Sequence, residues 1–140
     1  MRRDIIIIAL IAMVVIALAI VLVPLFFGPS SAEIGSVSFD KDLYHSNEVM
    51  NITISVNARG ATENATLRLA GIKDRYGDLR LEKEIPVILS PGLYTVTYDY
   101  KLPPCSHCAG IDPGPYQIEV ELVRNGTVIS NTTRTVQLEQ

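Results

Sequence analysis

The sequence predicts an all-β fold, a sandwich of seven antiparallel strands preceded by one N-terminal transmembrane helix. Three observations carry this prediction. Residues 5–27 are almost entirely apolar. From residue 34 onward apolar residues recur with period two, and no window of helical length shows an apolar stripe at i, i+3, i+4 and i+7. Clusters of Gly, Pro, Asn and Asp recur at roughly 8- to 15-residue intervals, as in sandwiches built from short strands.

The apolar run at 5–27 is broken only near its end, by a proline. As an α-helix rising about 1.5 Å per residue, residues 5–23 would span roughly 28 Å, the thickness of a bilayer's hydrocarbon core. Arg2 and Arg3 precede the run, and the positive-inside rule then places residues 1–4 in the cytoplasm. We therefore expect a single-pass plasma-membrane protein that contacts the lipid bilayer and carries an extracytoplasmic domain.

A cleaved secretory signal is the alternative to this membrane anchor. The hydrophobic region of such a signal has roughly 7 to 15 residues, and the run at 5–27 is longer. Residues 30–32, Ser-Ser-Ala, nevertheless put small side chains at the −3 and −1 positions that signal peptidases require. Under either reading residues 34–140 form an extracytoplasmic domain, which in the anchored form follows a short linker at 28–33.

The strands are expected at residues 34–39, 48–58, 65–72, 79–89, 93–101, from 116 up to the turn at 125, and 127–139. The second of these is the clearest, because Met50, Ile52 and Ile54 alternate with polar residues and predict one buried and one solvated face. In the last strand the apolar phase changes between Ile129 and Val136, which predicts a bulge or bend there.

The turns sort the loops into two ends of the sandwich. Asn125-Gly126 predicts a two-residue hairpin, because both central residues of a type I′ turn need positive φ. If successive strands alternate in direction, the loops at 40–47, 73–78 and 102–115 gather at the distal end, away from the membrane. The last residues of the chain join them there.

Residues 112–116, Asp-Pro-Gly-Pro-Tyr, resemble the Asp-x-Gly-x-Tyr segment that leads into strand F of immunoglobulin-like domains. In those domains the tyrosine forms a corner with the preceding backbone. The resemblance implies an Ig-like sandwich in which Asp112, Gly114 and Tyr116 specify the fold at this corner. Ile118 stands where antibody-type domains have their second core cysteine, so the likeness is to Ig-like domains in the broad sense.

Residues 39–44, Phe-Asp-Lys-Asp-Leu-Tyr, followed by Glu48 and Val49, resemble the opening segment of macroglobulin-type (MG2-like) domains. That segment runs Asp-Lys-x-x-Tyr-x-Pro-Gly-Glu-x-Val, and here Ser46-Asn47 replaces Pro-Gly. The resemblance implies the same Ig-like fold on a membrane-anchored surface protein, of archaeal type.

The predicted domain is acidic. The chain has 12 Lys and Arg and 15 Asp and Glu, and leaving out Arg2, Arg3 and Asp4 gives 10 against 14, a net charge of −4. Such a surface repels phosphate backbones, so nucleic acid is not expected as a partner.

The chain has no Gly-x-Ser-x-Gly, His-Glu-x-x-His or glycine-rich phosphate-loop motif, so neither enzymatic activity nor a cofactor is expected. The acid pairs Asp40/Asp42 and Asp74/Asp78 are expected in solvated turns.

Both cysteines lie in a Cys-Ser-His-Cys motif, at Cys105 and Cys108. Covalent haem attachment needs a histidine directly after the second cysteine, and Ala109 stands there. A structural disulfide between the two cysteines suits an oxidising exterior. A thioredoxin-like redox pair and a zinc or copper site remain as alternatives. The metal site would use both cysteines with His107 or His45, which share the predicted distal end.

Four Asn-x-Ser/Thr sequons are candidate N-glycosylation sites, each on a wet strand face or in a turn: Asn51, Asn64, Asn125 and Asn131. They predict a glycoprotein if the host has the machinery. The alternative is that Asn and Thr are simply common on exposed strands and turns.

The leading functional hypothesis is a membrane-anchored Ig-like module that mediates protein–protein interaction in the cell envelope or serves as an accessory subunit of a membrane complex. A second hypothesis rests on similarity in architecture to archaeal motility stator proteins, which contact the surface layer. A filament-forming subunit and a metal or redox carrier are further alternatives. The sequence leaves the oligomeric state open.

Overall fold

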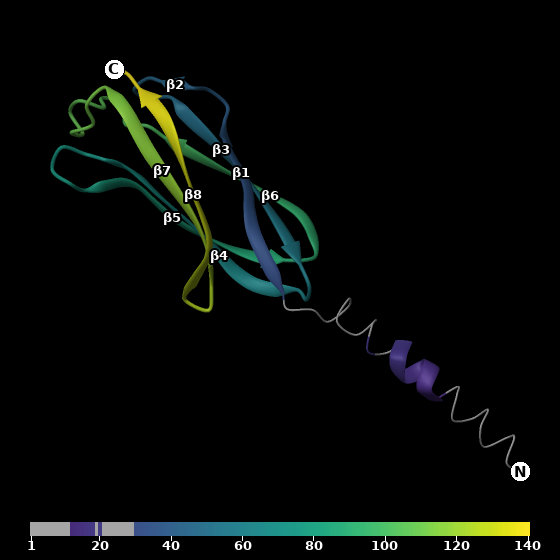
Figure 1. Ribbon diagram of the computed structural model, residues 1–140. Coiled ribbons are helices and arrows are strands. Elements are labelled where there is room, and N and C mark those ends of the chain that lie inside the picture. The colour runs from purple at the N-terminus through teal and green to yellow at the C-terminus, as the bar shows by residue number, and fades with distance from the viewer. Residues whose placement is uncertain (1–11, 19, 21–29) are drawn as a thin grey trace, which may run out of the picture.

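The computed structural model describes residues 12–18, 20 and 30–140, of which 30–140 form an elongated β-sandwich (Figure 1). Residues 12–18 and 20 are helical. Within these described ranges no helix combines the length and apolar character needed to cross a membrane. Most of the predicted transmembrane segment at 5–27, and all of the predicted cytoplasmic residues 1–4, lie outside the described residues.

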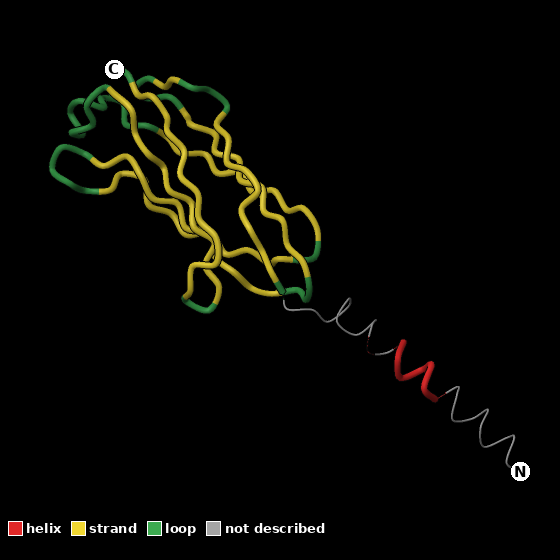
Figure 2. The backbone as a smooth tube through the Cα atoms, viewed as in Figure 1, coloured by secondary structure: helices red, strands yellow, loops and turns green. Residues whose placement is uncertain are grey.

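The sandwich has eight strands, arranged in two layers (Figure 2). The strands are β1 (Ser31–Phe39), β2 (Leu43–Tyr44), β3 (Val49–Arg59), β4 (Glu63–Lys73), β5 (Leu79–Leu89), β6 (Gly92–Lys101), β7 (Gly114–Arg124) and β8 (Thr127–Leu138). One sheet has the order β1-β3-β6 and the other β2-β8-β7-β4-β5. The all-β sandwich expected from the period-two pattern is confirmed.

The core lies between the two sheets and is made by the apolar face of each strand. Every second residue of β3, from Met50 to Val56, is fully buried, and the same holds for Leu67 and Leu69 in β4. In β7 the buried positions are Ile118, Val120 and Leu122. The inward residues of β6 are only partly buried, because β6 is an edge strand with one open side.

The prediction of seven antiparallel strands is wrong in one respect. The short strand β2 lies within the segment predicted as a loop, and it pairs in parallel with β8. Two residues are too few to show a period, so the pattern could not reveal this strand. Tertiary contacts create it: Tyr44 is fully buried, and the amide of Glu139 donates to its carbonyl oxygen at 2.8 Å.

Three local features can be compared with the sequence. The strand β1 begins at Ser31, within the predicted linker, because its backbone pairs with Arg59 and Ala58 even where its side chains show no apolar pattern. The irregularity predicted in β8 between Ile129 and Val136 lies at the very start of that interval: Leu122 pairs with Ser130 and Val123 with Val128, so Ile129 is an extra, bulged residue. The hairpin turn has the expected positive φ at Asn125 (50°) and Gly126 (77°).

The two ends of the sandwich carry different loops (Figure 1). We call distal the end formed by residues 40–48, 74–78 and 102–113 with Glu139 and Gln140. We call proximal the opposite end, where the chain enters at Ser30; the residues that belong to it are 30–34, 57–65, 87–95 and 123–130. Backbone hydrogen bonds join the distal loops, from Asn47 N to Pro103 O (2.9 Å) and from Arg75 N to Gly110 O (2.8 Å). The predicted gathering of these loops at one end is confirmed.

Candidate functional site

The motif at the distal end contains a disulfide between Cys105 and Cys108, with 5.2 Å between their Cα atoms. The disulfide expected from the sequence is therefore present. A sulfur atom in a disulfide is not a thiolate, and thiolates are the form in which cysteine ligates metals. In this state the two cysteines do not supply the sulfur ligands of the alternative zinc or copper site.

The disulfide closes one helical turn. Cys105 stands at its N-cap, where Sγ accepts a hydrogen bond from the Cys108 amide at 3.1 Å. At the other end Gly110 has φ +80°, its amide donates to His107 O (3.0 Å), and the Ile111 amide donates to Ser106 O (2.8 Å). This pair of bonds is a Schellman motif, in which glycine supplies the left-handed residue. The loop therefore has a fixed conformation beyond what its cysteines impose.

The β2–β3 loop clamps the disulfide loop from one side through two serines. The Ser46 hydroxyl lies 2.8 Å from the Ser106 hydroxyl and accepts the Ser106 amide at 3.0 Å. Ser106 is 3% exposed, so its amide depends on this partner rather than on water.

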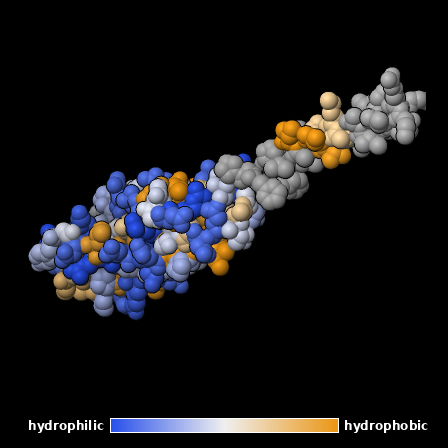
Figure 3. Space-filling model, turned by 90° about the horizontal axis from the view of Figure 1, so that it is seen from below, coloured by the Kyte–Doolittle hydropathy of each residue, from blue (hydrophilic) through white to orange (hydrophobic). Residues whose placement is uncertain are grey.

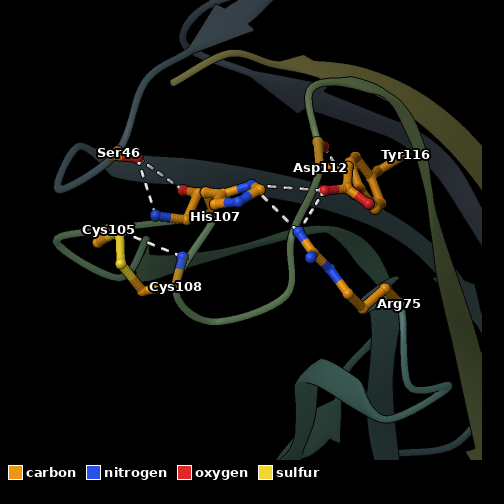
Figure 4. A network of polar contacts seen from close by, with 8 residues as sticks. Ser46, Arg75, Cys105, His107, Cys108, Asp112 and Tyr116 are labelled. Carbon is orange, nitrogen blue, oxygen red and sulfur yellow. Dashed lines mark hydrogen bonds and ion pairs between the residues drawn. A yellow bond between two sulfur atoms is a disulfide. The ribbon is translucent and has the colours of Figure 1, made fainter.

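The β4–β5 turn clamps the loop from the other side through Arg75 (Figure 4). Its Nη2 donates to Asp112 Oδ1 at 2.6 Å and lies 3.1 Å from His107 Nδ1. The Arg75 backbone amide also donates to Gly110 O. One residue of the turn thus fixes three points of the disulfide loop, on the surface rather than in the core.

The carboxylate of Asp74 accepts the hydrogen bonds that hold the β4–β5 turn together. Its side chain is buried, and it accepts hydrogen bonds from the amides of Tyr76 (2.8 Å) and Asp78 (2.9 Å) and from Arg80 Nε (2.8 Å). Burial by itself raises the pKa of Asp74, but these donors outweigh it and hold the pKa below its ordinary value. The expectation of a solvated Asp74 is wrong.

The sequence did carry a signal for this role of Asp74. Aspartate at the start of a turn accepts the amide two residues on, which here belongs to Tyr76. What the sequence lacked was the position of Arg80, which pairs with the same carboxylate.

Tyr116 forms the corner that its resemblance implied. Its hydroxyl donates to Asp112 O at 2.8 Å, and Gly114 between them has φ +147°, in a region that favours glycine. Burial raises the pKa of Tyr116. Asp112 therefore serves twice, with its carbonyl oxygen bound to the corner and its carboxylate bound to Arg75.

Asp40 and Tyr44 fix the start of the β1–β3 connection. The Tyr44 hydroxyl donates to Asp40 Oδ1 at 2.6 Å, and the Asn51 amide donates to the same oxygen at 2.8 Å. The Tyr44 hydrogen bond, with that of Asn51, lowers the pKa of Asp40. Burial and then the Asp40 hydrogen bond raise the pKa of Tyr44. Asp40 is thus exposed in its turn, as expected, and serves there as a structural acceptor.

The two histidines reach the distal end, but they contact different partners. His45 lies 3.8 Å from Glu48 and 3.5 Å from Glu139, whereas His107 contacts Arg75 and Asp112. Across residues 12–18, 20 and 30–140, His, Cys, Asp and Glu side chains form no group of three or more that could hold a metal ion. The metal site suggested for the distal end is therefore not assembled in the described part of the chain.

The sequon asparagines differ in accessibility. Asn64, Asn125 and Asn131 are exposed. Asn51 is only partly exposed, and its Nδ2, the atom that a glycan would modify, donates to Asp99 Oδ1 at 2.7 Å. Three of the four predicted glycosylation sites are therefore exposed to solvent. The side chain of the fourth, Asn51, is held by a hydrogen bond between β3 and β6.

A hollow of about 630 Å³ lies beside the distal end on the outer face of the five-stranded sheet, with Lys73, Leu79 and Glu119 among its lining residues. A Cβ on Gly71 would lie 2.8 Å from Gln117 O, so only glycine lets β4 and β7 approach this closely. Ile72 has φ +52°, which is rare for a β-branched side chain. The backbone is thus strained at the edge of this hollow.

Searches against protein families and against curated proteins find no match for this chain. Several solved structures share its fold. A CARDB domain from Pyrococcus furiosus, solved in complex with di-metal ions, is 18% identical with a TM-score of 0.54, and the match covers 81% of this chain and 92% of that one. An alkylpurine DNA glycosylase from Pseudomonas fluorescens is 13% identical with a TM-score of 0.60 over 79% of this chain.

A cycloisomaltooligosaccharide glucanotransferase from Paenibacillus is 17% identical with a TM-score of 0.57 over 80% of this chain. The match spans only 31% of the glycosylase and 15% of the glucanotransferase. At these identities the similarity concerns the fold alone. Together with the corner at Tyr116 and the two-sheet topology, it shows that the chain contains an Ig-like β-sandwich.

Proposed function

We propose that this protein is a single-pass, membrane-anchored module whose outward-facing Ig-like domain docks its distal end onto another protein of the cell envelope. The observation that carries the proposal is the fixed conformation of that end. A disulfide, a Schellman turn and clamps from Ser46 and Arg75 hold its loops together. A surface that is ordered before binding loses less conformational entropy on association.

The exposed side chains of the distal end suit a protein partner. Tyr76 is 75% exposed, and Leu43 also presents apolar surface, as do Val49 and Leu79 at the adjoining ends of β3 and β5. They stand among charged groups such as those of Arg75. Aromatic and arginine side chains are enriched where protein interfaces are most buried, with polar groups around them. The hollow beside Leu79 offers space for a side chain of the partner.

Site-specific crosslinking tests the docking proposal. A photoreactive phenylalanine analogue replaces Tyr76 in one variant and Ile88, which is 61% exposed in β5 at the proximal end, in a matched control. On irradiation in native membranes the Tyr76 variant should give one adduct of discrete mass, and the Ile88 variant should not give that adduct. Equal adducts from both positions, or none from Tyr76, would contradict a docking surface at the distal end.

The membrane anchor rests on the apolar run at 5–27 and has its own test. Membranes that express the full chain are extracted with alkaline carbonate, and intact cells or right-side-out vesicles are treated with protease. An anchored chain stays in the pellet while its sandwich is digested from outside. Release into the supernatant at the mass of a truncated chain would instead support the cleaved signal at residues 30–32.

We also propose N-glycosylation in a host that has the machinery, at the exposed sequon of Asn131. Asn131 lies on the outer face of β8, and its amide is exposed. Asn51 should stay unmodified because its amide is held by Asp99. Glycopeptide mass spectrometry on protein from native membranes measures the occupancy of each site, and an unmodified intact mass would end the proposal.

A further inference from the structure

The proximal end of the sandwich has few charges. Its residues, 30–34, 57–65, 87–95 and 123–130, include four side chains that are charged at neutral pH: Glu33, Arg59, Glu63 and Arg124. Two are acidic and two basic, so they sum to zero, and Arg124 is paired with Glu63 at 2.9 Å. This end is close to neutral within a domain whose net charge is −4, which removes the main electrostatic obstacle to contact with lipid.

Apolar side chains project from the same end. Leu93 is 75% exposed, Ile88 61%, Val128 43% and Tyr94 37%. They come from β6, β5 and β8, so both sheets contribute. Figure 3 shows hydrophobic surface on the sandwich as small patches within a mostly hydrophilic body. Single exposed apolar residues are common, and only their coincidence with the scarcity of charge distinguishes this end.

The chain enters the sandwich at this end through Ser30, whose position is held by two contacts. Ser30 O accepts a hydrogen bond from Arg124 Nη1 at 3.0 Å, and a Cβ on Gly60 would lie only 2.7 Å from the Ser30 Cα atom. The apolar run ends at residue 27, three residues before Ser30. Three residues reach at most about 11 Å, so an anchored run keeps the proximal end within that distance of the lipid.

We propose that the proximal end rests on the lipid surface of the membrane that anchors the chain, with Leu93 and Ile88 inserted at the boundary between headgroups and acyl chains and Tyr94 at headgroup level. The proposal rests on the membrane anchor of the proposed function. Apolar side chains at such a surface lie roughly 5–10 Å into that boundary, a depth within reach of the short tether, and tyrosine is enriched there. Lipid contact at one end orients the sandwich and points the distal loops outward.

The arrangement has a consequence for glycosylation. Asn125 lies in the hairpin that carries Val128 at the proximal end, and a glycan on its amide would stand between the hairpin and the lipid. The same holds for Asn64, which pairs with Ile88 across β4 and β5. The proposal therefore requires Asn125 and Asn64 to be unmodified, whereas Asn131 is free to carry a glycan. Modified Asn125 or Asn64 in protein from native membranes would overturn the lipid contact.

The absence of tryptophan from the chain allows a direct test. Leu93→Trp places a probe at the proximal end, and Tyr76→Trp places one at the distal end, where the replaced side chain is equally exposed at 75%. Each full-length variant is reconstituted into nanodiscs whose lipids carry bromine high on the acyl chains. Leu93→Trp should emit at shorter wavelength than Tyr76→Trp and should be strongly quenched, while Tyr76→Trp stays unquenched.

Failure of the lipid contact and failure of the anchor give different results. If the chain resists alkaline extraction but Leu93→Trp is no more quenched than Tyr76→Trp, the proximal end does not touch lipid and the anchor stands. If the chain is released by alkali, the anchor fails and the lipid contact fails with it. Ile88→Trp repeats the test on the other sheet and should match Leu93→Trp.

Discussion

The two ends of the sandwich are closed by different interactions. At the proximal end the turns are short: residues 60–62, 90–91 and the Asn125–Gly126 pair connect the strands. Positive φ at Gly60, Asn125 and Gly126 reverses the chain there. At the distal end residues 102–113 form a long loop that keeps its shape through contacts with two other loops, which supply Ser46 and Arg75.

This difference shows how each end responds to a change in sequence. A short turn depends on the backbone conformation of its own residues, so a substitution elsewhere leaves it intact. A long loop loses its conformation when a partner from another part of the chain is removed. Substitutions at the distal end should therefore cost more stability than matched substitutions at the proximal end, and their effects should spread further.

The largest contrast is expected between Asp74→Ala and Glu63→Ala. Removal of the buried Asp74 carboxylate leaves two amides and Arg80 without their acceptor. We expect the melting temperature to fall by about 10 °C. The proximal Glu63 pairs with Arg124 near solvent, and its loss should cost about 2 °C or less. Calorimetry on both variants decides the comparison, and equal losses would mean that the two ends are held alike.

Loss of the disulfide should have the next largest effect. The double substitution Cys105→Ser and Cys108→Ser opens a loop closed over a sequence separation of 3, which should lower the free energy of unfolding by about 2 kcal/mol. Urea unfolding measures the loss, and wild-type protein in reductant serves as a control. Hydrogen exchange should accelerate in residues 103–113 and stay unchanged around Gly126. Acceleration at both ends would show that the two ends unfold as one unit.

A matched pair of glycines separates backbone conformation from packing. Gly110 and Gly126 have φ +80° and +77°, so alanine at either position should cost about 1 kcal/mol. At Gly110 the new Cβ would also lie 3.1 Å from Tyr76 Cε2, whereas at Gly126 nothing lies within 4 Å. Gly110→Ala should therefore cost about 1 kcal/mol more in chemical denaturation. In a Tyr76→Ala background this excess should vanish, and its persistence would refute the packing explanation.

The smallest effect is expected for Asp40 in acid. The hydrogen bond from Tyr44 holds the pKa of Asp40 below its unfolded value, so its contribution is complete above about pH 4 and is lost as the pH falls through the folded pKa. Asp40→Asn should lower stability at pH 7 but little at pH 2. Thermal melts from pH 7 to pH 2 should thus show a weaker acid dependence in the variant. Parallel curves would contradict the pKa shift.

The features that could be predicted from the amino-acid pattern are those set by neighbours along the chain. Alternation from Met50 to Val56 identified a strand with one buried face, because side chains of a strand point to opposite sides. Asn125-Gly126 identified its turn, since few other residue pairs accept positive φ twice. The spacing of Asp112 and Tyr116 identified the corner that their hydrogen bond forms.

Features that depend on residues far apart in sequence became visible only in the folded protein. It brought Ser46 to Ser106, paired Arg75 with Asp112, buried Asp74 against Arg80 and added β2 to the edge of β8. It also separated His45 from His107, which the loop order alone had placed at one end. Alternation assigns a residue to a face and an end of the sandwich, but the partner of each polar group depends on which loops pack together.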